Sequence, residues 1–185
     1  MRQQNIIIFF LLVPFVIGIG TFRASAGNLQ PAAQVEYKIK AAFLLNFAKF
    51  ITWPQKSSPE EDQSFTMCVL GEDPFGPSLA GIEARSVRGE KINLRYIGDT
   101  EQTTGCRLLF VSRSEKERLG DILAALQGKS IVTVSDIQGF AARGGSIEFV
   151  TRGNRLSFII NLAQANKQGV HMNASLLNLA TRVIR

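Results

Sequence analysis

A strand, a helix and a second strand follow one another in the middle of the chain, and this order constrains the fold more than any other feature. Residues 107–111 and 131–134 are short, nearly continuous apolar runs, which is typical of buried strands. Between them, residues 114–117 form a capping box, apolar residues recur at helical spacing, and Gly128 ends the helix. Two strands joined in this way are parallel, with a right-handed crossover and helices on both faces of the sheet.

The remaining chain extends this α/β pattern in one domain. Further strands are predicted at residues 65–70, 92–97, 146–151 and 155–160. The last two are separated by little more than Gly153-Asn154, a dipeptide that tolerates positive φ, so they predict a β-hairpin. Closing helices are predicted at residues 162–167 and 175–184. The expected fold is a mostly parallel sheet with helices on both faces, followed by a C-terminal hairpin and closing helices.

The first helix begins near Val35 and is apolar on most sides. Lys38 and Lys49 lie about three turns apart and share its narrow polar face, and Trp53-Pro54 ends it. Leu44, Leu45 and Ile51 widen the apolar surface. The stripe predicted to face the core is formed by Ile39, Ala42, Phe43, Asn46, Phe47 and Phe50.

The first 26 residues resemble a secretory signal peptide. Arg2 gives a positive start, residues 5–19 are apolar, and Ala24-Ser25-Ala26 fits the site that signal peptidase cleaves, which predicts cleavage before Gly27. The alternative is a membrane anchor, but an apolar run of about 15 residues is shorter than the roughly 20 that cross a bilayer. We therefore expect a signal peptide at 1–26, a domain at 27–185 and a periplasmic location without a stable membrane anchor.

The charge of the exported domain is only mildly basic. The whole chain of 185 residues carries +6, and the leader removes Arg2 and Arg23 but no acid, leaving +4. The remaining Lys and Arg residues are scattered and form no cationic block. The sequence therefore gives no support for nucleic acid as a partner.

The two cysteines are predicted to form a disulfide. An even count in an oxidising compartment indicates pairing of Cys68 with Cys106, and two separate buried thiols are the alternative. Cys68 lies in the first strand and Cys106 begins the third. Because a disulfide joins Cα atoms about 5.5 Å apart, close to the spacing of adjacent strands, pairing would make these strands neighbours. The four strands before the hairpin would then have the order 2-1-3-4.

Groups that carry out catalysis are sparse. His171 is the only histidine, and no nucleophile motif accompanies the imaginable combination of Ser135, Asp136 and His171. One histidine and two bridged cysteines do not supply the usual ligands of zinc. We therefore expect no enzyme activity, no cofactor and no metal, and a hydrolase that uses Ser135 or Asp136 is the alternative.

A ligand site is predicted where the parallel strands end, because ligands of open α/β sheets bind at the carboxyl ends of strands. Arg113, beside a helix N-terminus, could meet an anion. Ordinary turns and helix caps explain the same residues, so this alternative stays open. The candidate residues are Gly71, Asp73, Ser112, Arg113, Ser135 and Asp136.

The segment that carries Phe140 lies between the fourth and fifth strands and is followed by Gly144-Gly145. An aromatic side chain on a loop can dock a partner protein, and it can equally pack into the core. Phe140 is therefore a candidate partner contact, together with Phe43 and Phe47 of the first helix, whose apolar surface exceeds what one small sheet covers.

Several stretches resemble the YfiR-like family of periplasmic proteins. The similarity is collinear over the mature chain, and its most specific parts are the first helix, KAAFLLNFAKFITWP at residues 40–54, and TVSD with GF at residues 133–140. CVLGEDPFG at residues 68–76, LFVS at 109–112 and FIIN at 158–161 extend it.

The resemblance implies a regulator that binds the periplasmic segment of an inner-membrane diguanylate cyclase and restrains it, so that cyclic-di-GMP and biofilm output rise when the restraint is lifted. It also implies self-association, here expected as a homodimer. Some members carry a second cysteine pair near the positions of Ala141 and Glu148, which this chain lacks. A periplasmic small-molecule-binding accessory protein of a transporter or sensor is the alternative function.

Overall fold

The computed structural model describes residues 30–54, 64–153 and 155–185, so the predicted leader and its cleavage before Gly27 lie outside the described residues. The α-helices are α1 (Gln30–Phe50), α2 (Pro77–Glu83), α3 (Leu119–Ala125), α4 (Leu162–Lys167) and α5 (Ala174–Leu179), and the 3-10 helices are η1 (Thr100–Thr103) and η2 (Arg113–Arg118). The strands are β1 (Ile51–Thr52), β2 (Phe65–Leu70), β3 (Ser86–Val87), β4 (Glu90–Ile97), β5 (Leu108–Val111), β6 (Val132–Ser135), β7 (Ile147–Arg152), β8 (Arg155–Asn161), β9 (His171–Met172) and β10 (Arg182–Ile184).

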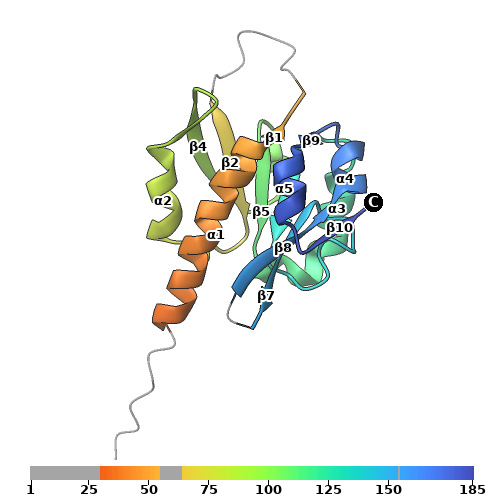
Figure 1. Cartoon of the computed structure of the whole chain (residues 1–185). Coiled ribbons are helices and arrows are strands. Elements are labelled where there is room, and N and C mark those ends of the chain that lie inside the picture. The colour runs from red at the N-terminus through yellow and green to blue at the C-terminus, as the bar shows by residue number, and fades with distance from the viewer. Residues whose placement is uncertain (1–29, 55–63, 154) are drawn as a thin grey trace, which may run out of the picture.

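A mixed, mostly parallel sheet forms the centre of the domain (Figure 1). Its strands lie in the order β10-β8-β7-β6-β5-β2-β4-β3, and only the pairs β3–β4 and β7–β8 are antiparallel. The α/β class and the predicted hairpin, β7 and β8, are confirmed. The four-strand order is an incomplete description of this sheet, because β3 extends it at one end and β7, β8 and β10 at the other.

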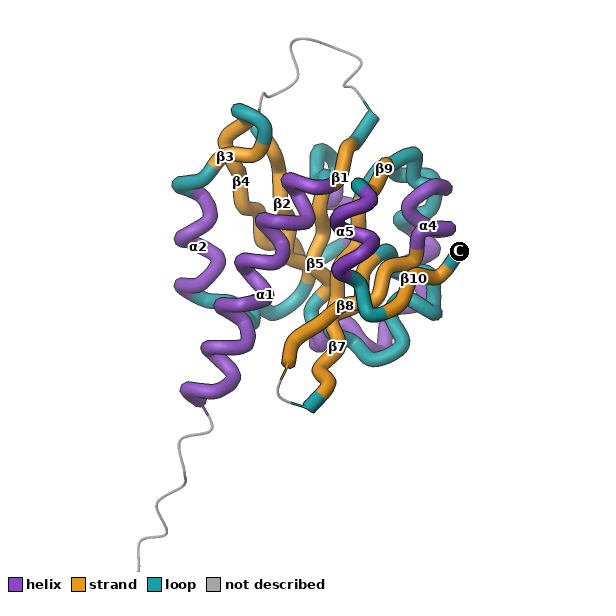
Figure 2. Tube along the Cα trace, viewed as in Figure 1, coloured by secondary structure: helices purple, strands orange, loops and turns teal. Residues whose placement is uncertain are grey.

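The strands are buried on both sides because a separate apolar core covers each face of the sheet. Met67 and Val69 of β2 belong to the core under α1 and α2, whereas Cys68 and Leu70 point into the core under α3. This alternation follows from the two-residue period of a strand. Figure 2 shows α1, α2 and α5 on the near face of the sheet. The prediction of helices on both faces is therefore confirmed.

The buried side of α1 differs from the predicted stripe. Ile39, Ala42, Asn46 and Phe50 are exposed, Phe43 is half-buried, and of the predicted set only Phe47 is fully buried. The helix is apolar on more than one side, so the sequence period does not determine which side packs on the sheet. The residues that face the core are Lys40, Ala41, Leu44, Leu45, Phe47 and Ala48.

The crossover helix begins differently from its prediction as well. Residues 113–118 form η2, and the α-helix starts only at Leu119. Ser114 does not act as the expected cap, because its Oγ accepts a hydrogen bond from the backbone N–H of Glu72 at 3.0 Å. The capping-box serine thus ties the start of η2 to the loop that follows β2.

The last predicted helix, residues 175–184, is wrong in its second half. The helix α5 ends at Leu179, Ala180 is extended, and residues 182–184 form β10, which pairs in parallel with β8. The backbone N–H of Thr181 starts this pairing with a 2.8 Å hydrogen bond to the carbonyl of Phe158. A free sheet edge and the β-branched residues of this segment favour a strand over another helical turn.

Candidate functional site

A cavity of about 300 Å³ lies at the carboxyl ends of the central parallel strands. Arg113 follows β5 and Asp136 follows β6, and because these strands are neighbours, both side chains line the same cavity. Residues from α1 and from the hairpin β7–β8 complete it. The other lining residues are Glu36, Lys40, Gln138, Glu148, Phe149, Val150, Thr151 and Leu156.

Asp136 is the centre of a buried charged cluster in this cavity. Its side chain is only 2% exposed, and its Oδ2 accepts hydrogen bonds from Lys40 Nζ at 2.5 Å and from Tyr37 Oη at 2.9 Å. Lys40 is itself 1% exposed and also lies 2.5 Å from Glu36 Oε1. Burial, together with the nearby Asp136 carboxylate, raises the pKa of Tyr37, so the phenol stays protonated and donates to Asp136.

The second carboxylate oxygen of Asp136 lacks such partners. Oδ1 is buried and accepts no hydrogen bond from the described residues. It lies 3.2 Å from Arg113 Nε, but without the geometry of a hydrogen bond, and the Arg113 side chain is 63% exposed. A buried oxygen without a donor is costly, so Oδ1 is the most unusual polar atom of the site.

Ser135 does not share the role of Asp136. Its Oγ donates to the carbonyl of Val111 at 2.7 Å and accepts from the N–H of Ile137 at 3.0 Å, so the hydroxyl joins β5 to β6. His171 lies in β9, which pairs with β1 outside the main sheet. The described residues show no hydrogen bond or ion pair between His171 and Ser135 or Asp136.

The other three candidate residues also stay outside the cavity lining. The carboxylate of Asp73 accepts from the N–H groups of Phe75 at 2.8 Å and Gly76 at 3.1 Å, which is a turn. Ser112 is buried and caps η2 without a side-chain hydrogen bond. Gly71 adopts a φ of +88° beside Ser114. Of the six candidates, Arg113 and Asp136 are therefore the two that the structure brings together in the cavity.

Gly71→Ala is expected to lower the free energy of unfolding by about 3 kcal/mol. Alanine would be strained in the left-handed backbone conformation of this position, and its methyl group would collide with neighbouring side chains. An added Cβ would lie 2.4 Å from Ser114 Oγ and 2.5 Å from Glu115 Oε1. Gly89→Ala is the matched control, because Gly89 has a similar φ of +86° and no atom near its Cβ position. Gly89→Ala should lower the free energy of unfolding, measured with urea, by about 1 kcal/mol. Equal losses for the two variants would contradict a close contact at Gly71.

Three residues of the charged cluster around Asp136 were missed by sequence analysis, namely Glu36, Tyr37 and Lys40. The available signal was the position of Lys40 in the sequence, one helical turn after Glu36 and between the apolar residues Ile39 and Ala41, and the structure places it among the core-facing residues of α1. A lysine in such a position requires a buried carboxylate partner, because an unpaired buried ammonium is very costly.

Phe47 and Phe140, two of the predicted partner contacts, are completely buried in the core of this chain. Phe43 is half-buried and packs on Phe149 and Phe158 of the hairpin.

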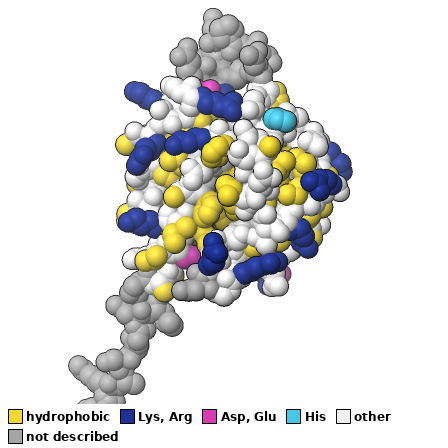
Figure 3. All heavy atoms as spheres, in the orientation of Figure 1, with side chains coloured by type: hydrophobic (Ala, Val, Ile, Leu, Met, Phe, Trp, Pro, Cys, Tyr) yellow, Lys and Arg dark blue, Asp and Glu magenta, His cyan; other side chains and the backbone are white. Residues whose placement is uncertain are grey.

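The helix α1 exposes three large apolar side chains, Val35, Ile39 and Phe50, which are here called the α1 face. Leu179, on the neighbouring α5, is 66% exposed. Figure 3 shows apolar side chains across this side of the molecule, with more basic than acidic side chains around them.

The Phe140 loop is closed by hydrogen bonds of Glu148. Its carboxylate accepts from the N–H groups of Gly139 at 2.9 Å and Ala141 at 3.0 Å, while the Phe140 ring packs so closely on Gly145 that a Cβ there would lie 2.1 Å away. Positions 141 and 148, where the second cysteine pair of similar proteins is expected, are thus connected by a carboxylate in this chain.

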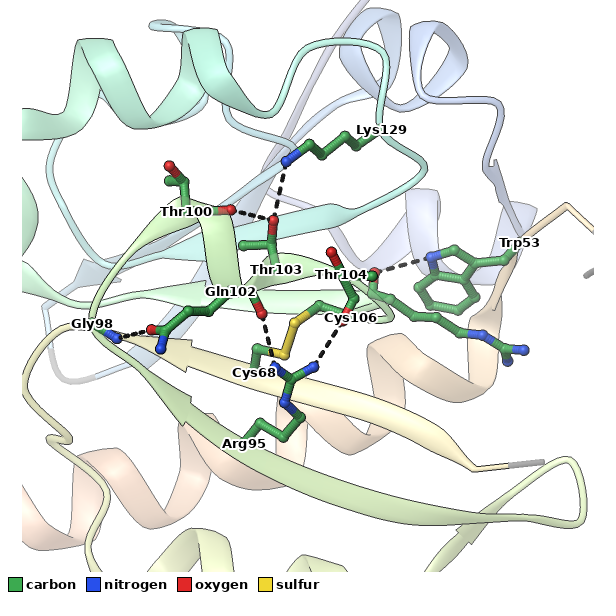
Figure 4. Close-up of a disulfide and its surroundings, with 11 residues drawn as sticks. Trp53, Cys68, Arg95, Gly98, Thr100, Gln102, Thr103, Thr104, Cys106 and Lys129 are labelled. Carbon is green, nitrogen blue, oxygen red and sulfur yellow. Dashed lines mark hydrogen bonds between the residues drawn. A yellow bond between two sulfur atoms is a disulfide. The ribbon is translucent and has the colours of Figure 1, made fainter. Parts of the chain in front are cut away.

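Cys68 and Cys106 form a disulfide with a Cα–Cα distance of 5.9 Å (Figure 4). It connects β2 with the segment that precedes β5, and these strands pair in parallel. Arg95 of β4 donates to the carbonyls of Gln102 at 2.9 Å and Thr104 at 2.7 Å, so it holds the same segment from the next strand. The disulfide lies in the core under α3, on the sheet face opposite α1.

Among residues 30–54, 64–153 and 155–185, no group of three or more His, Cys, Asp or Glu side chains is placed to hold a metal ion. In the same part of the chain, no helix combines the length and apolarity of a transmembrane span.

A family model described as YfiR/HmsC-like matches residues 37–181, from the first turns of α1 to the residue before β10. The match therefore includes the disulfide, every residue that lines the cavity except Glu36, and Ile39 and Phe50 of the α1 face.

Two solved structures share the fold at low sequence identity. The ABC domain in complex with L-Trp from Streptococcus pneumoniae has a TM-score of 0.56 and 12% identity over 78% of this chain. A conserved domain protein from Vibrio cholerae O1 biovar El Tor has a TM-score of 0.53 and 9% identity over 80% of this chain. The chain spans 60% of the length of each structure, and the likeness concerns the fold alone.

Proposed function

This chain belongs to the YfiR/HmsC-like family, and from that membership we propose that it restrains an inner-membrane diguanylate cyclase by binding the cyclase's periplasmic segment. The family match over residues 37–181 is the observation that carries the proposal. Release of the restraint raises cyclic-di-GMP and biofilm formation. The chain acts by surface complementarity and without catalysis.

The proposed location is the periplasm, reached through a leader at residues 1–26 that is removed before Gly27. The Cys68–Cys106 disulfide supports this location, because disulfides persist in oxidising compartments and are rare in the cytosol.

The α1 face is the proposed contact surface for the cyclase. The exposed fraction of the side chain is 57% for Val35, 44% for Ile39 and 38% for Phe50. Lys38 and Lys49 are exposed on the same helix and no acidic residue lies in its first turn. The expected partner surface is therefore apolar with an acidic rim, which complements both features.

Deletion of the gene in its own host is expected to raise intracellular cyclic-di-GMP and surface attachment, and the wild-type chain should restore both. Ile39→Glu should fail to restore them, because a carboxylate on an apolar contact surface weakens binding by at least about tenfold. Ala124→Glu is the matched control, since Ala124 is exposed on α3, on the opposite side of the sheet. Cyclic-di-GMP is quantified by mass spectrometry of cell extracts.

Unchanged cyclic-di-GMP after deletion would refute the regulatory role. Full restoration by Ile39→Glu would refute the α1 face as the contact surface and would leave the regulatory role intact.

We further propose that the same face joins two copies of the chain as a homodimer in the absence of the cyclase. Light scattering of the purified wild-type domain tests this, and a monomeric mass at micromolar concentration would contradict it.

A periplasmic small-molecule-binding protein that serves a transporter or sensor is the second candidate function. The cavity at the strand ends favours it, because its volume of about 300 Å³ is at the lower end of the range for ligand pockets. A ligand that stays bound through purification would support this function.

A further inference from the structure

The cavity contains one strong hydrogen-bond acceptor that the protein leaves unused. Asp136 Oδ1 is buried and accepts no hydrogen bond from the described residues, whereas Oδ2 of the same carboxylate accepts two. A carboxylate oxygen in this position stabilises a group that donates a hydrogen bond and carries positive charge. Arg113 is the nearest such group, but its guanidinium makes no hydrogen bond to Oδ1.

The charges of the cavity also favour a cation. Its lining includes three carboxylates, Glu36, Asp136 and Glu148, and two basic side chains, Lys40 and Arg113. Lys40 is held in place by the first two carboxylates at 2.5 Å. The Arg113 side chain is 63% exposed and makes no hydrogen bond to Oδ1, so it can leave the carboxylate without breaking one. When Arg113 turns to solvent, Lys40 alone faces the three carboxylates, and one more positive charge at Oδ1 would offset one of the two remaining negative charges.

We propose that this cavity binds the primary ammonium group of a small organic cation, which donates to Asp136 Oδ1 in the place that Arg113 now occupies. The lining also has an apolar part, in which Phe149 is buried and Val150 and Leu156 are half-buried, and this part suits a short alkyl chain. The ligand and Arg113 therefore compete for the same carboxylate oxygen, Asp136 Oδ1. This proposal does not depend on the regulation of a cyclase.

The role of Arg113 distinguishes a cation site from an anion site. For a cation, Arg113 is a competitor and a like charge, so Arg113→Ala should strengthen binding by about two- to fivefold, the size of a partly exposed ion-pair effect. For an anion, Arg113 would be the main ligand-binding group, and the same variant would abolish binding.

The test is isothermal titration calorimetry of the mature domain with n-butylammonium chloride, and with sodium butyrate as the anionic probe of similar size. Wild type should bind butylammonium and not butyrate, Arg113→Ala should bind butylammonium more tightly, and Asp136→Asn should not bind it. Lys116→Ala is the matched control, because Lys116 is an exposed cation of η2 outside the cavity lining. It should bind as wild type does.

Asp136→Asn removes a partner of the buried Lys40, so its folding must be checked by circular dichroism. Leu156→Trp provides an independent variant that fills the cavity from its apolar wall without touching the ion pair, and it should also abolish binding. Absence of butylammonium binding to both wild type and Arg113→Ala would overturn the proposal. Binding of butyrate that is lost in Arg113→Ala, or butylammonium binding that Leu156→Trp leaves unchanged, would overturn it as well.

Discussion

Lys40→Met is expected to lower the free energy of unfolding by about 3 kcal/mol, near the lower end of the range for breaking a buried ion pair. The variant removes the ammonium group that lies 2.5 Å from Asp136 Oδ2 and leaves a carboxylate that is only 2% exposed. Arg113, 3.2 Å from Oδ1, compensates part of the charge, which is why the lower end applies. Urea unfolding at neutral pH measures the loss.

Two further variants separate the buried charge from the loss of packing. Lys38→Met, on the exposed side of the same helix, should change stability by no more than about 0.5 kcal/mol. The double variant Lys40→Met/Asp136→Leu should recover most of the loss, because an apolar pair replaces the ion pair and no buried charge remains unpaired. A loss below 1 kcal/mol for Lys40→Met, or no recovery in the double variant, would contradict a buried ion pair at this site.

The central sheet could be predicted because its strands leave little freedom. Three strands are buried on both faces, namely residues 65–70, 108–111 and 132–135. A short, continuous run of apolar or small residues is typical of such a buried strand. The hairpin followed from its turn glycine and from two strands of matching length. These signals are local, so they are complete in the sequence itself.

The errors occur where a contact with a distant segment decides the structure. Residues 175–184 have helical spacing throughout, but the free edge of β8 recruits residues 182–184 as β10. The wrong prediction of the buried side of α1 has the same cause. Several sides of this helix are apolar, and its contacts with the sheet, α2 and the hairpin determine which side is buried. Local periodicity contains no information about an available edge or face.

The candidate site was predictable in part for the same reason. Parallel strands bring their carboxyl ends together, so the proximity of Arg113 and Asp136 follows from topology. The contribution of α1 does not, because Lys40 and Tyr37 are 96 and 99 positions away from Asp136 along the chain. Only the packing of α1 across the strand ends turns an ordinary turn aspartate into the centre of a charged cluster.

Replacement of both Cys68 and Cys106 by alanine is expected to lower the free energy of unfolding by about 4 kcal/mol. The disulfide closes a loop of 38 positions, and the chain-entropy model assigns about this value to a loop of that length. Such a loss is a large share of the stability of a domain of this size. Urea unfolding of the variant and of wild type, with and without a reductant, measures it.

The loss of the disulfide should mainly affect the segment at 99–105, which precedes Cys106. Without the disulfide, the segment at 99–105 keeps the two hydrogen bonds from Arg95 to the carbonyls of Gln102 and Thr104. Arg95→Ala alone should therefore cost about 1 kcal/mol or less, and it should cost more in the cysteine-free background, because the covalent connection of this segment to β2 is already lost there. Strictly additive losses would show that the disulfide and Arg95 act on separate parts of the fold. A loss below 1 kcal/mol for the cysteine variant would show that strand pairing alone holds β2 and β5 together.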